Sequence, residues 1–288
     1  MTPAATPNPK PLGRAWGHDP DVPHFYLGGV PISITDMDGL VSAIRRRLGR
    51  PSPAPGTFVV FRDAHGVVRA QDDPVIMAAH DAALLVCADG RPIAWAGRLR
   101  GHKAIAQVPG IESVEFVCRA GVEAGWRHFY LGGGPGVAEK LAREMSARVP
   151  GLAVAGAETL PYRPLTELES QALYERLRAN GTQILWIGLS TPKQELFMQA
   201  HTPSLPGVIA MGVGAAFDVN TGAIPRAPSL MTRLGLEWLY RLIREPGRLR
   251  ARYAEVVPRF VAIVAFDRMR RAKHATETSP ASGKVRSV

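Results

Sequence analysis

The sequence predicts an α/β fold in which a parallel sheet is covered by helices on both faces. Short apolar runs typical of buried strands alternate along the chain with segments that carry apolar residues at helical spacing. The runs are nearly continuous in apolar residues, as expected for strands that are buried on both faces. Several of them end in polar or glycine-bearing turns, where ligands bind in such folds.

The elements follow in chain order. A two-strand hairpin is expected at 24–34, and a helix follows that begins at Thr35 as its N-cap and ends at Gly49. The expected strands of the sheet are 57–61, 83–88, 127–133, 152–157, 183–189 and 207–214. The expected helices are 73–82, 91–101, 111–125, 136–149, 166–181 and 192–201. Thr166 and Glu169 form the sequence signature of a capping box.

Four segments describe the domain organisation. Residues 1–22 are rich in Pro and Ala and are expected to be a disordered leader. Residues 23–225 form the α/β core, and the pattern becomes helical after Arg226, so 226–274 is expected to be a basic amphipathic appendage. Residues 275–288 are expected to be a disordered tail. The complete fold expected is a Rossmann-like parallel sheet with a small N-terminal β/α element and a C-terminal helical appendage.

Composition limits the class of protein. The chain has 288 residues, 46% of them hydrophobic, and its two cysteines form neither a disulfide framework nor a metal-ligand pattern. No signal-peptide core or bilayer-spanning run is visible, so a cytoplasmic protein is expected. The net charge is +10, and residues 241–273 alone carry +7. Such a localised basic segment favours contact with an anionic membrane surface, with nucleic acid or another protein as alternatives.

Several strand ends carry groups suited to an anionic, sugar-like ligand, each with a structural alternative. The turn 132–136, with Gly132, Gly133, Gly134 and Gly136, precedes a helix and suits either phosphate binding or a tight turn alone. Asp89 follows a strand and suits a general base or a turn-capping residue. Gln194 and Lys193 open a helix, where they suit a sugar and a phosphate or a solvated helix start.

Two further strand ends and the appendage also carry candidate residues. Gly214 and Asp218 follow a strand in a run of small residues, and they suit either ligand approach or tight packing. His65 lies just past the first strand of the sheet, where a structural role is the alternative. In the appendage, the arginines interleave with apolar residues as in interfacial helices: Arg241, Arg244, Arg248, Arg250 and Arg252.

The segments FYLGGGPGVAE, STPKQE, GVGAAFD and RAPSLMTRLGLEWLYRLIREPGRLRARY resemble the WecG/TagA/CpsF family of bacterial glycosyltransferases over roughly residues 25–265. The resemblance implies an inverting enzyme that works without metal or cofactor. It would move N-acetylmannosamine or a related sugar from a UDP donor to an undecaprenyl-diphosphate-linked acceptor. It also implies a peripheral position at the inner face of the plasma membrane, a role in cell-surface polysaccharide synthesis and no nucleic-acid partner.

The resemblance also assigns roles to residues. It implies that Asp89 is the general base and that Gln194 is an active-site residue, and it keeps the family's His at His65. The glycines of 132–136 and the turn from Gly214 to Asp218 would surround the nucleotide. The arginine-rich end would dock on the membrane and complete the site.

Three positions in two motifs depart from the family pattern. Val60 and Arg62 replace the Thr and Asn of the T-x-N-x-x-H motif. Gln107 stands where many members have an arginine that holds the leaving diphosphate, and Arg62 or a tail arginine is expected to replace it. A weakly active nucleotide-sugar-binding paralogue and a nucleotide-dependent oxidoreductase remain as alternative functions, and a homo-oligomer is expected.

Overall fold

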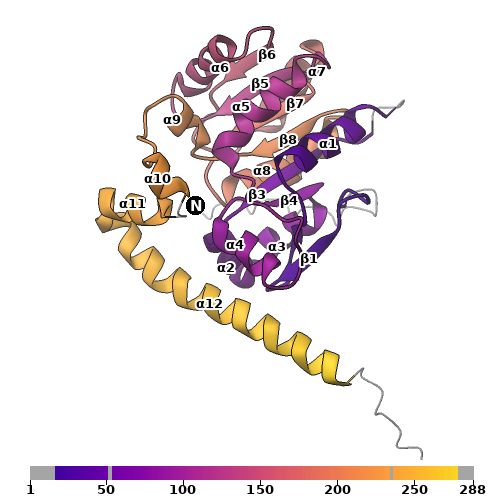
Figure 1. Cartoon of the computed structure of the whole chain (residues 1–288). Helices are drawn as coiled ribbons and strands as arrows, with labels where there is room; N and C mark the ends of the chain where they lie inside the picture. The colour runs from indigo at the N-terminus through magenta and orange to yellow at the C-terminus, as the bar shows by residue number, and fades with distance from the viewer. Residues whose placement is uncertain (1–16, 51–53, 234–235, 278–288) are drawn as a thin grey trace, which may run out of the picture.

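A six-stranded parallel sheet forms the centre of the protein (Figure 1). The computed structural model describes residues 17–50, 54–233 and 236–277. The strands are β3 (Thr57–Arg62), β4 (Leu85–Ala88), β5 (Arg127–Gly132), β6 (Ala153–Glu158), β7 (Ile184–Gly188) and β8 (Ile209–Gly212). They lie in the order β4-β3-β8-β7-β5-β6, and every neighbouring pair is parallel. The structure therefore confirms the α/β fold with a Rossmann-like parallel sheet.

Helices cover both faces of this sheet. They are α1 (Met37–Leu48), α2 (Ala64–Asp72), α3 (Pro74–Ala82), α4 (Arg91–Arg98), α5 (Gly110–Gly121), α6 (Val137–Arg148), α7 (Glu167–Ala179), α8 (Lys193–His201) and α9 (Ala216–Asn220). In β3, Phe58 and Val60 belong to one apolar cluster, whereas Val59 and Phe61 belong to another on the opposite face. Each fully buried side chain of this size contributes about 1.5–3 kcal/mol, so both faces stabilise the sheet.

The N-terminal β/α element follows the expected hairpin and helix, with one difference at the helix start. β1 (His24–Leu27) and β2 (Val30–Ser33) pair in antiparallel register. The N-cap of α1 is Asp36 rather than the predicted Thr35, because the Asp36 carboxylate accepts from the N–H of Gly39 at 2.8 Å. The capping box of Thr166 and Glu169 at α7 is present as predicted.

Two segments differ from the sequence expectations. The short helix α2 was not predicted, and it begins where the Asp63 carboxylate accepts from the N–H of Gly66 at 2.8 Å. Residues 17–22, assigned to the disordered leader, contact the core, since Asp19 is buried and pairs with Arg46 at 2.9 Å. Residues 275–277, assigned to the disordered tail, continue helix α12 instead, while residues 1–16 and 278–288 of the expected leader and tail lie outside the described residues.

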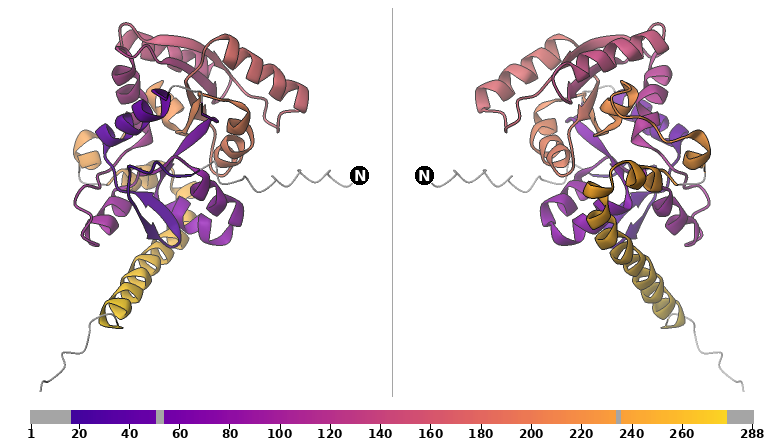
Figure 2. Two further views of the ribbon diagram at one scale, coloured as in Figure 1. Left: turned by 90° about the vertical axis from the view of Figure 1, so that its right-hand side faces the viewer. Right: turned by 90° about the vertical axis from the view of Figure 1, so that its left-hand side faces the viewer.

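The appendage consists of three helices that run from the side of the sheet to beneath it (Figures 1 and 2). They are α10 (Ser229–Arg233), α11 (Glu237–Arg244) and α12 (Pro246–Glu277). Val256 and Phe260 of α12 are buried in the core, and Arg259 forms a two-pronged ion pair with Asp72 of α2. No helix within the described ranges is long and apolar enough to cross a bilayer. One face of α12 is therefore part of the folded core.

Candidate functional site

The predicted site residues gather along one edge of the sheet, where the strands end at their carboxyl termini. Because all six strands are parallel, these ends share one rim. Asp89 follows β4, His65 follows β3, Gly214 follows β8, Gln194 follows β7, and the glycine turn follows β5. The structure thus places these predicted residues on a common rim. Their separation from Asp89 along this rim depends on the order of the strands.

Asp89 is held by the backbone at the start of α5. Its Oδ1 accepts from the N–H of Gly110 at 2.7 Å, while its own N–H donates to the carbonyl of Arg62 at 2.9 Å. Asp89 does not cap α4, whose N-cap is Gly90 without a side-chain bond. Among the described residues no donor contacts Oδ2 of Asp89. One carboxylate oxygen is thereby fixed and the other remains available.

The pKa of Asp89 is raised to about 6, chiefly because the carboxyl group is desolvated. The hydrogen bond from Gly110 and the charge of Arg241 lower this pKa, while Asp63 and Glu237 raise it. Arg241 and Glu237 belong to α11, so the appendage reaches the surroundings of Asp89. A carboxylate with this pKa is ionised at neutral pH and is a stronger base than a solvated one.

Gln107, which stands in the place of the expected arginine, forms a hydrogen bond with the main chain of Asp89. Its Nε2 donates to the backbone carbonyl of Asp89 at 2.7 Å. The amide therefore fixes the main chain that carries the carboxylate. It supplies no positive charge to the rim, unlike the arginine expected at this position.

Arg62, which was expected to replace that arginine, is paired inside the protein instead, so this expectation is wrong. Its side chain is 1% exposed, and its Nη2 donates to Oε1 of Glu195 at 2.7 Å. Both members of this ion pair are buried beneath the rim. The two buried charges are tolerated because they pair with each other. The pairing occupies the guanidinium group that was expected to bind a phosphate.

The same carboxylate positions Gln194. Oε1 of Glu195 also accepts from the amide of Gln194 at 3.2 Å and from the hydroxyl of Thr191 at 3.1 Å. The Gln194 Oε1 atom is buried and has no hydrogen-bond partner among the described residues. A Cβ added at Gly212 would lie 3.1 Å from Cδ of Gln194, so that side chain lies against the end of β8. The arrangement leaves a polar carbonyl beside the β8 turn.

His65 lies in the first turn of α2, next to the end of β3. Burial lowers its pKa, the charge of Asp63 opposes this shift, and the charges of Arg252, Arg69 and Arg62 reinforce it. The imidazole is consequently neutral at pH 7 and can donate one hydrogen bond and accept another.

The glycine turn is farther from Asp89 than the sequence analysis assumed. β4 and β5 are separated by four inter-strand spacings of about 4.8 Å each, or about 19 Å along the sheet. Gly132, Gly133 and Gly136 have positive φ, and Gly133 donates its N–H to the carbonyl of Gly188 at 2.8 Å. Gly134 and Gly136 are exposed. Only an extended ligand could therefore contact both the turn and Asp89.

The β8 turn lies between these two ends. Gly214 has φ of +52°, and a Cβ there would be 3.6 Å from Oε1 of Gln194. Phe217 fills the space beneath the turn, since a Cβ at Gly188 would lie 2.5 Å from its ring. Asp218 is half-buried in α9, one residue past this ring. The middle of the rim is thus built from small residues over an aromatic floor.

Lys193 is exposed at the start of α8, where its Nζ lies 4.0 Å from the ring centroid of Tyr162. Tyr162 is 96% exposed and comes from the loop after β6. A cation over an aromatic face is favourable. The pair exposes an ammonium group and a phenol ring near the glycine end of the rim. Tyr162 was not among the predicted site residues.

The five predicted tail arginines differ in their relation to the rim. Arg241 acts on the charge of Asp89, and Arg252 acts on that of His65. Arg244 and Arg250 are exposed, and no interaction with the rim is seen for either. Arg248 lies in α12, and its side chain is outside the described part of the structure. Arg241 is thus the predicted tail arginine whose charge reaches Asp89.

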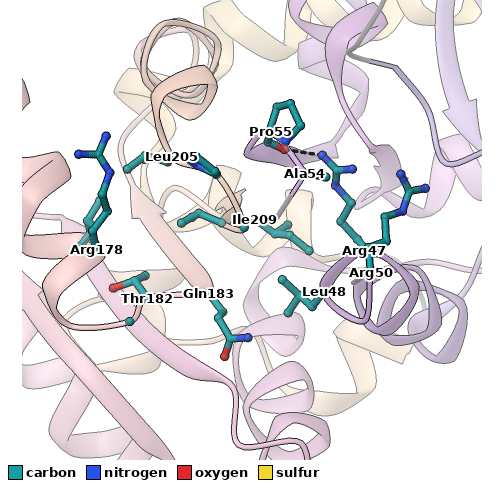
Figure 3. A pocket seen from close by; sticks show the side chains of 15 residues that line it. Arg47, Leu48, Arg50, Ala54, Pro55, Arg178, Thr182, Gln183, Leu205 and Ile209 are labelled. Atoms are coloured by element: carbon teal, nitrogen blue, oxygen red, sulfur yellow. Dashed lines mark hydrogen bonds between the residues drawn. The ribbon is translucent and has the colours of Figure 1, made fainter. Parts of the chain in front are cut away.

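A cavity of about 470 Å³ lies at the other end of the sheet, away from the predicted residues (Figure 3). Arg178 lies on one side of it and Arg47 and Arg50 on the other. Arg47 donates to the carbonyl of Pro55 and Arg178 to that of Ser204. Arg47 and Arg178 lie in the last turns of α1 and α7, where a cation interacts favourably with the helix dipole, and this explains their presence without a ligand.

The residues that sequence reasoning missed, Glu195 and Glu237, act on the predicted site residues rather than standing at strand ends themselves. Glu195 stood in the quoted PKQE segment, but its partner Arg62 is 133 positions away, and only the tertiary fold reveals the pair. Glu237 lies in the segment GLEWLYRL, where the amphipathic pattern indicates a role for the arginines and none for this glutamate.

A comparison with protein-family models agrees with this geometry. The model described as the Glycosyl transferase WecG/TagA/CpsF family matches residues 25–274. The matched region covers the sheet, the rim and almost all of the described appendage. The chain therefore belongs to the WecG/TagA/CpsF family of glycosyltransferases.

Proposed function

We propose that the protein is an inverting, metal-independent glycosyltransferase that uses a UDP-sugar donor. The sugar is an N-acetylhexosamine such as N-acetylmannosamine, and the acceptor is an undecaprenyl-diphosphate-linked glycan in cell-surface polysaccharide synthesis. The observation that carries the proposal is Asp89, a strand-end carboxylate with a pKa raised to about 6, one oxygen anchored and Arg241 nearby.

The proposed chemistry is a direct displacement at the anomeric carbon. Oδ2 of Asp89 takes the proton of the acceptor hydroxyl as that oxygen forms its bond to the anomeric carbon. The bond from this carbon to the β-phosphate oxygen breaks on the opposite side, and UDP leaves with the electron pair. Back-side attack inverts the configuration. Neutral His65 and the Gln194 carbonyl serve as hydrogen-bond partners for sugar hydroxyls.

Charge compensation for the leaving UDP comes from Arg241 in this proposal. The diphosphate lies over the β8 turn, where Gly214 allows close approach, and the uridine extends toward Gly134 and Gly136. Asp218 and the Lys193–Tyr162 pair flank that nucleoside end. This assignment moves the diphosphate away from the glycine turn, because that turn is about 19 Å from Asp89 along the sheet.

The proposed location is the inner face of the plasma membrane. The acceptor carries a polyprenyl chain that remains in the bilayer, while the exposed arginines of α11 and α12 contact anionic lipid. Arg244 and Arg250 belong to this membrane set rather than to the reaction centre.

The testing experiment is a transfer assay with a panel of UDP-sugars and a short-chain lipid-diphosphate acceptor, with UDP release as the readout. We expect acceptor-dependent release with one N-acetylhexosamine donor, unchanged by EDTA. Asp89→Asn is expected to bind UDP normally and to lose about 10²–10⁴ in rate. UDP-sugar binding without turnover would instead support the weakly active paralogue, and a fluorescence change on NADH titration would support the oxidoreductase.

A further inference from the structure

Helix α4, which begins directly after Asp89-Gly90, presents an unusual outer surface. Its inner side packs into the core through Ile93, Ala94 and Ala96. On its outer side Trp95 is 50% exposed and Leu99, one turn further on, is 75% exposed. Isolated exposed apolar residues are common on proteins. Trp95 and Leu99, the latter at the C-cap position just past α4, are four residues apart and so lie together as an apolar strip.

This strip lies in a basic surrounding. The segment 91–111 contains no Asp or Glu, and it carries Arg91, Arg98, Arg100 and Lys103. Arg98 and Lys103 are exposed, whereas Arg100 pairs with Asp267 of α12 at 3.2 Å. We refer to Arg91, Trp95, Arg98, Leu99 and Lys103 as the α4 face. An amphipathic helix with Trp, Leu and cations on its outer side is suited to the interface of an anionic bilayer.

The position of the α4 face relative to the reaction centre adds a second argument. Asp89 has α4 on one side in the chain and is also approached by α11, whose Arg241 acts on its charge. α11 in turn exposes Trp238 by 43% and Ile243 by 66%. Two separate elements beside one carboxylate therefore expose an aromatic and an aliphatic side chain together with arginines.

We propose that the α4 face is a membrane-contact surface of the catalytic core, separate from the C-terminal appendage, that inserts Trp95 and Leu99 between anionic lipids. Contact there holds the Asp89 end of the rim at the depth where the diphosphate of a lipid-linked acceptor emerges. This inference rests on the proposed function for its purpose, although the membrane contact itself requires no sugar nucleotide.

Charge favours lipid over a second copy of the chain as the occupant. A two-fold symmetric contact would place the α4 face against itself, so Arg98 and Lys103 would meet like charges. The whole chain carries +10, which opposes such pairing further. An anionic bilayer supplies the opposite charge and an apolar interior at once.

The test compares binding of the full-length protein to phosphatidylglycerol vesicles with binding of the variant Trp95→Asp/Leu99→Asp. We expect the variant to lose about tenfold or more in affinity, because two apolar anchors are lost and two like charges are added. The matched control is Leu168→Asp on α7, since Leu168 is 84% exposed but stands between Glu167 and Glu169. Its vesicle affinity is expected to match that of the wild type.

A second measurement uses intact anchors. In a Trp16→Phe/Trp238→Phe background, Trp95 is the exposed tryptophan, because Trp126 and Trp186 are buried. Brominated phosphatidylglycerol is expected to quench its fluorescence, and brominated phosphatidylcholine much less. Unchanged vesicle affinity of the double Asp variant, absence of quenching, or a shift from oligomer to monomer in place of lost vesicle binding would each overturn the proposal. Failure of UDP-sugar transfer would refute the proposed function and leave these vesicle results standing.

Discussion

Asp89 shows how its surroundings alter the acid–base chemistry of a single carboxyl group. The sequence identified it by its place after an apolar run, and the structure adds the anchoring N–H of Gly110 and the amide of Gln107. Desolvation raises its pKa, and this raises the basicity of the carboxylate at the cost of reduced ionisation in acid.

The pH dependence follows from that pKa. With a folded-state pKa of about 6, Asp89 is protonated below this pH, so kcat/KM should fall about tenfold per unit below pH 6 and level off above it. Burial lowers the pKa of His65 below its ordinary value, so His65 should not add a limb above pH 7. A pH-rate profile checks this, and a rate that stays constant down to pH 5 would contradict it.

The same shift has a consequence for stability with a defined sign. The folded-state pKa of Asp89 lies above its ordinary value of 3.8, so the folded state binds the proton more tightly. The contribution of Asp89 to the free energy of unfolding therefore decreases as pH rises from about 4 to 6. Asp89→Asn should remove this decrease, which urea titrations at pH 4.5 and 7 would measure.

The buried pair of Arg62 and Glu195 illustrates what a sequence does not reveal at this scale. Arg62 at a strand end read as a phosphate ligand, because its partner arrives from a distant helix. Glu195→Ala should destabilise the protein by about 3–5 kcal/mol, since it leaves a buried charge without compensation. The matched variant Asp72→Ala breaks the exposed pair with Arg259 and should change Tm little. Equal Tm shifts in thermal unfolding would show that burial does not govern the Arg62 pair.

At the scale of elements, the strands and long helices were predictable because each has a clear hydrophobic period and local caps such as Thr166 with Glu169. Helix α2 was not, because its AHGVVRAQD segment is short and carries a glycine, and the helix is fixed by the Asp63 cap and by contact with α12. The appendage was predicted as helical, but its division between core packing and exposed surface depends on Val256 and Phe260 meeting the core.

α11 supplies the reaction centre with a cation in this account. Arg241→Gln should lower kcat by about 10²–10³, as removal of one preorganised charge donor does in other enzymes. It should also raise the pKa of Asp89, because Arg241 lowers it, and so move the acid limb of the pH-rate profile to higher pH. The control Arg244→Gln changes an exposed arginine on the same helix and should alter neither quantity. Identical effects of the two variants would assign α11 to general charge rather than to the site.

Two adjacent residues of α12, Phe260 and Val261, differ in whether they contact the core. Phe260 is 7% exposed and Val261 is 60% exposed. Phe260→Ala should speed hydrogen exchange of the α12 amides, because it removes a packed side chain that holds the helix on the core. Val261→Ala should leave this exchange rate unchanged. Comparable exchange in the two variants would mean that α12 does not depend on this contact.

At the scale of the whole protein, the parallel sheet and the common rim were predictable from the alternation of strands and helices. The order of the strands was not, because no local pattern encodes that β8 inserts between β3 and β7. This order sets the distance between Asp89 and the glycine turn, and it changes the expected position of the diphosphate.

The position of a bound UDP-sugar in a crystal structure of the full chain tests the central claim most directly. The account predicts the uridine near Gly134 and Gly136, the diphosphate over Gly214, and the anomeric carbon about 6 Å from Oδ2 of Asp89, which leaves room for an acceptor oxygen between them. A nucleotide bound in the cavity of Arg47, Arg50 and Arg178, or a diphosphate held at the glycine turn, would contradict it.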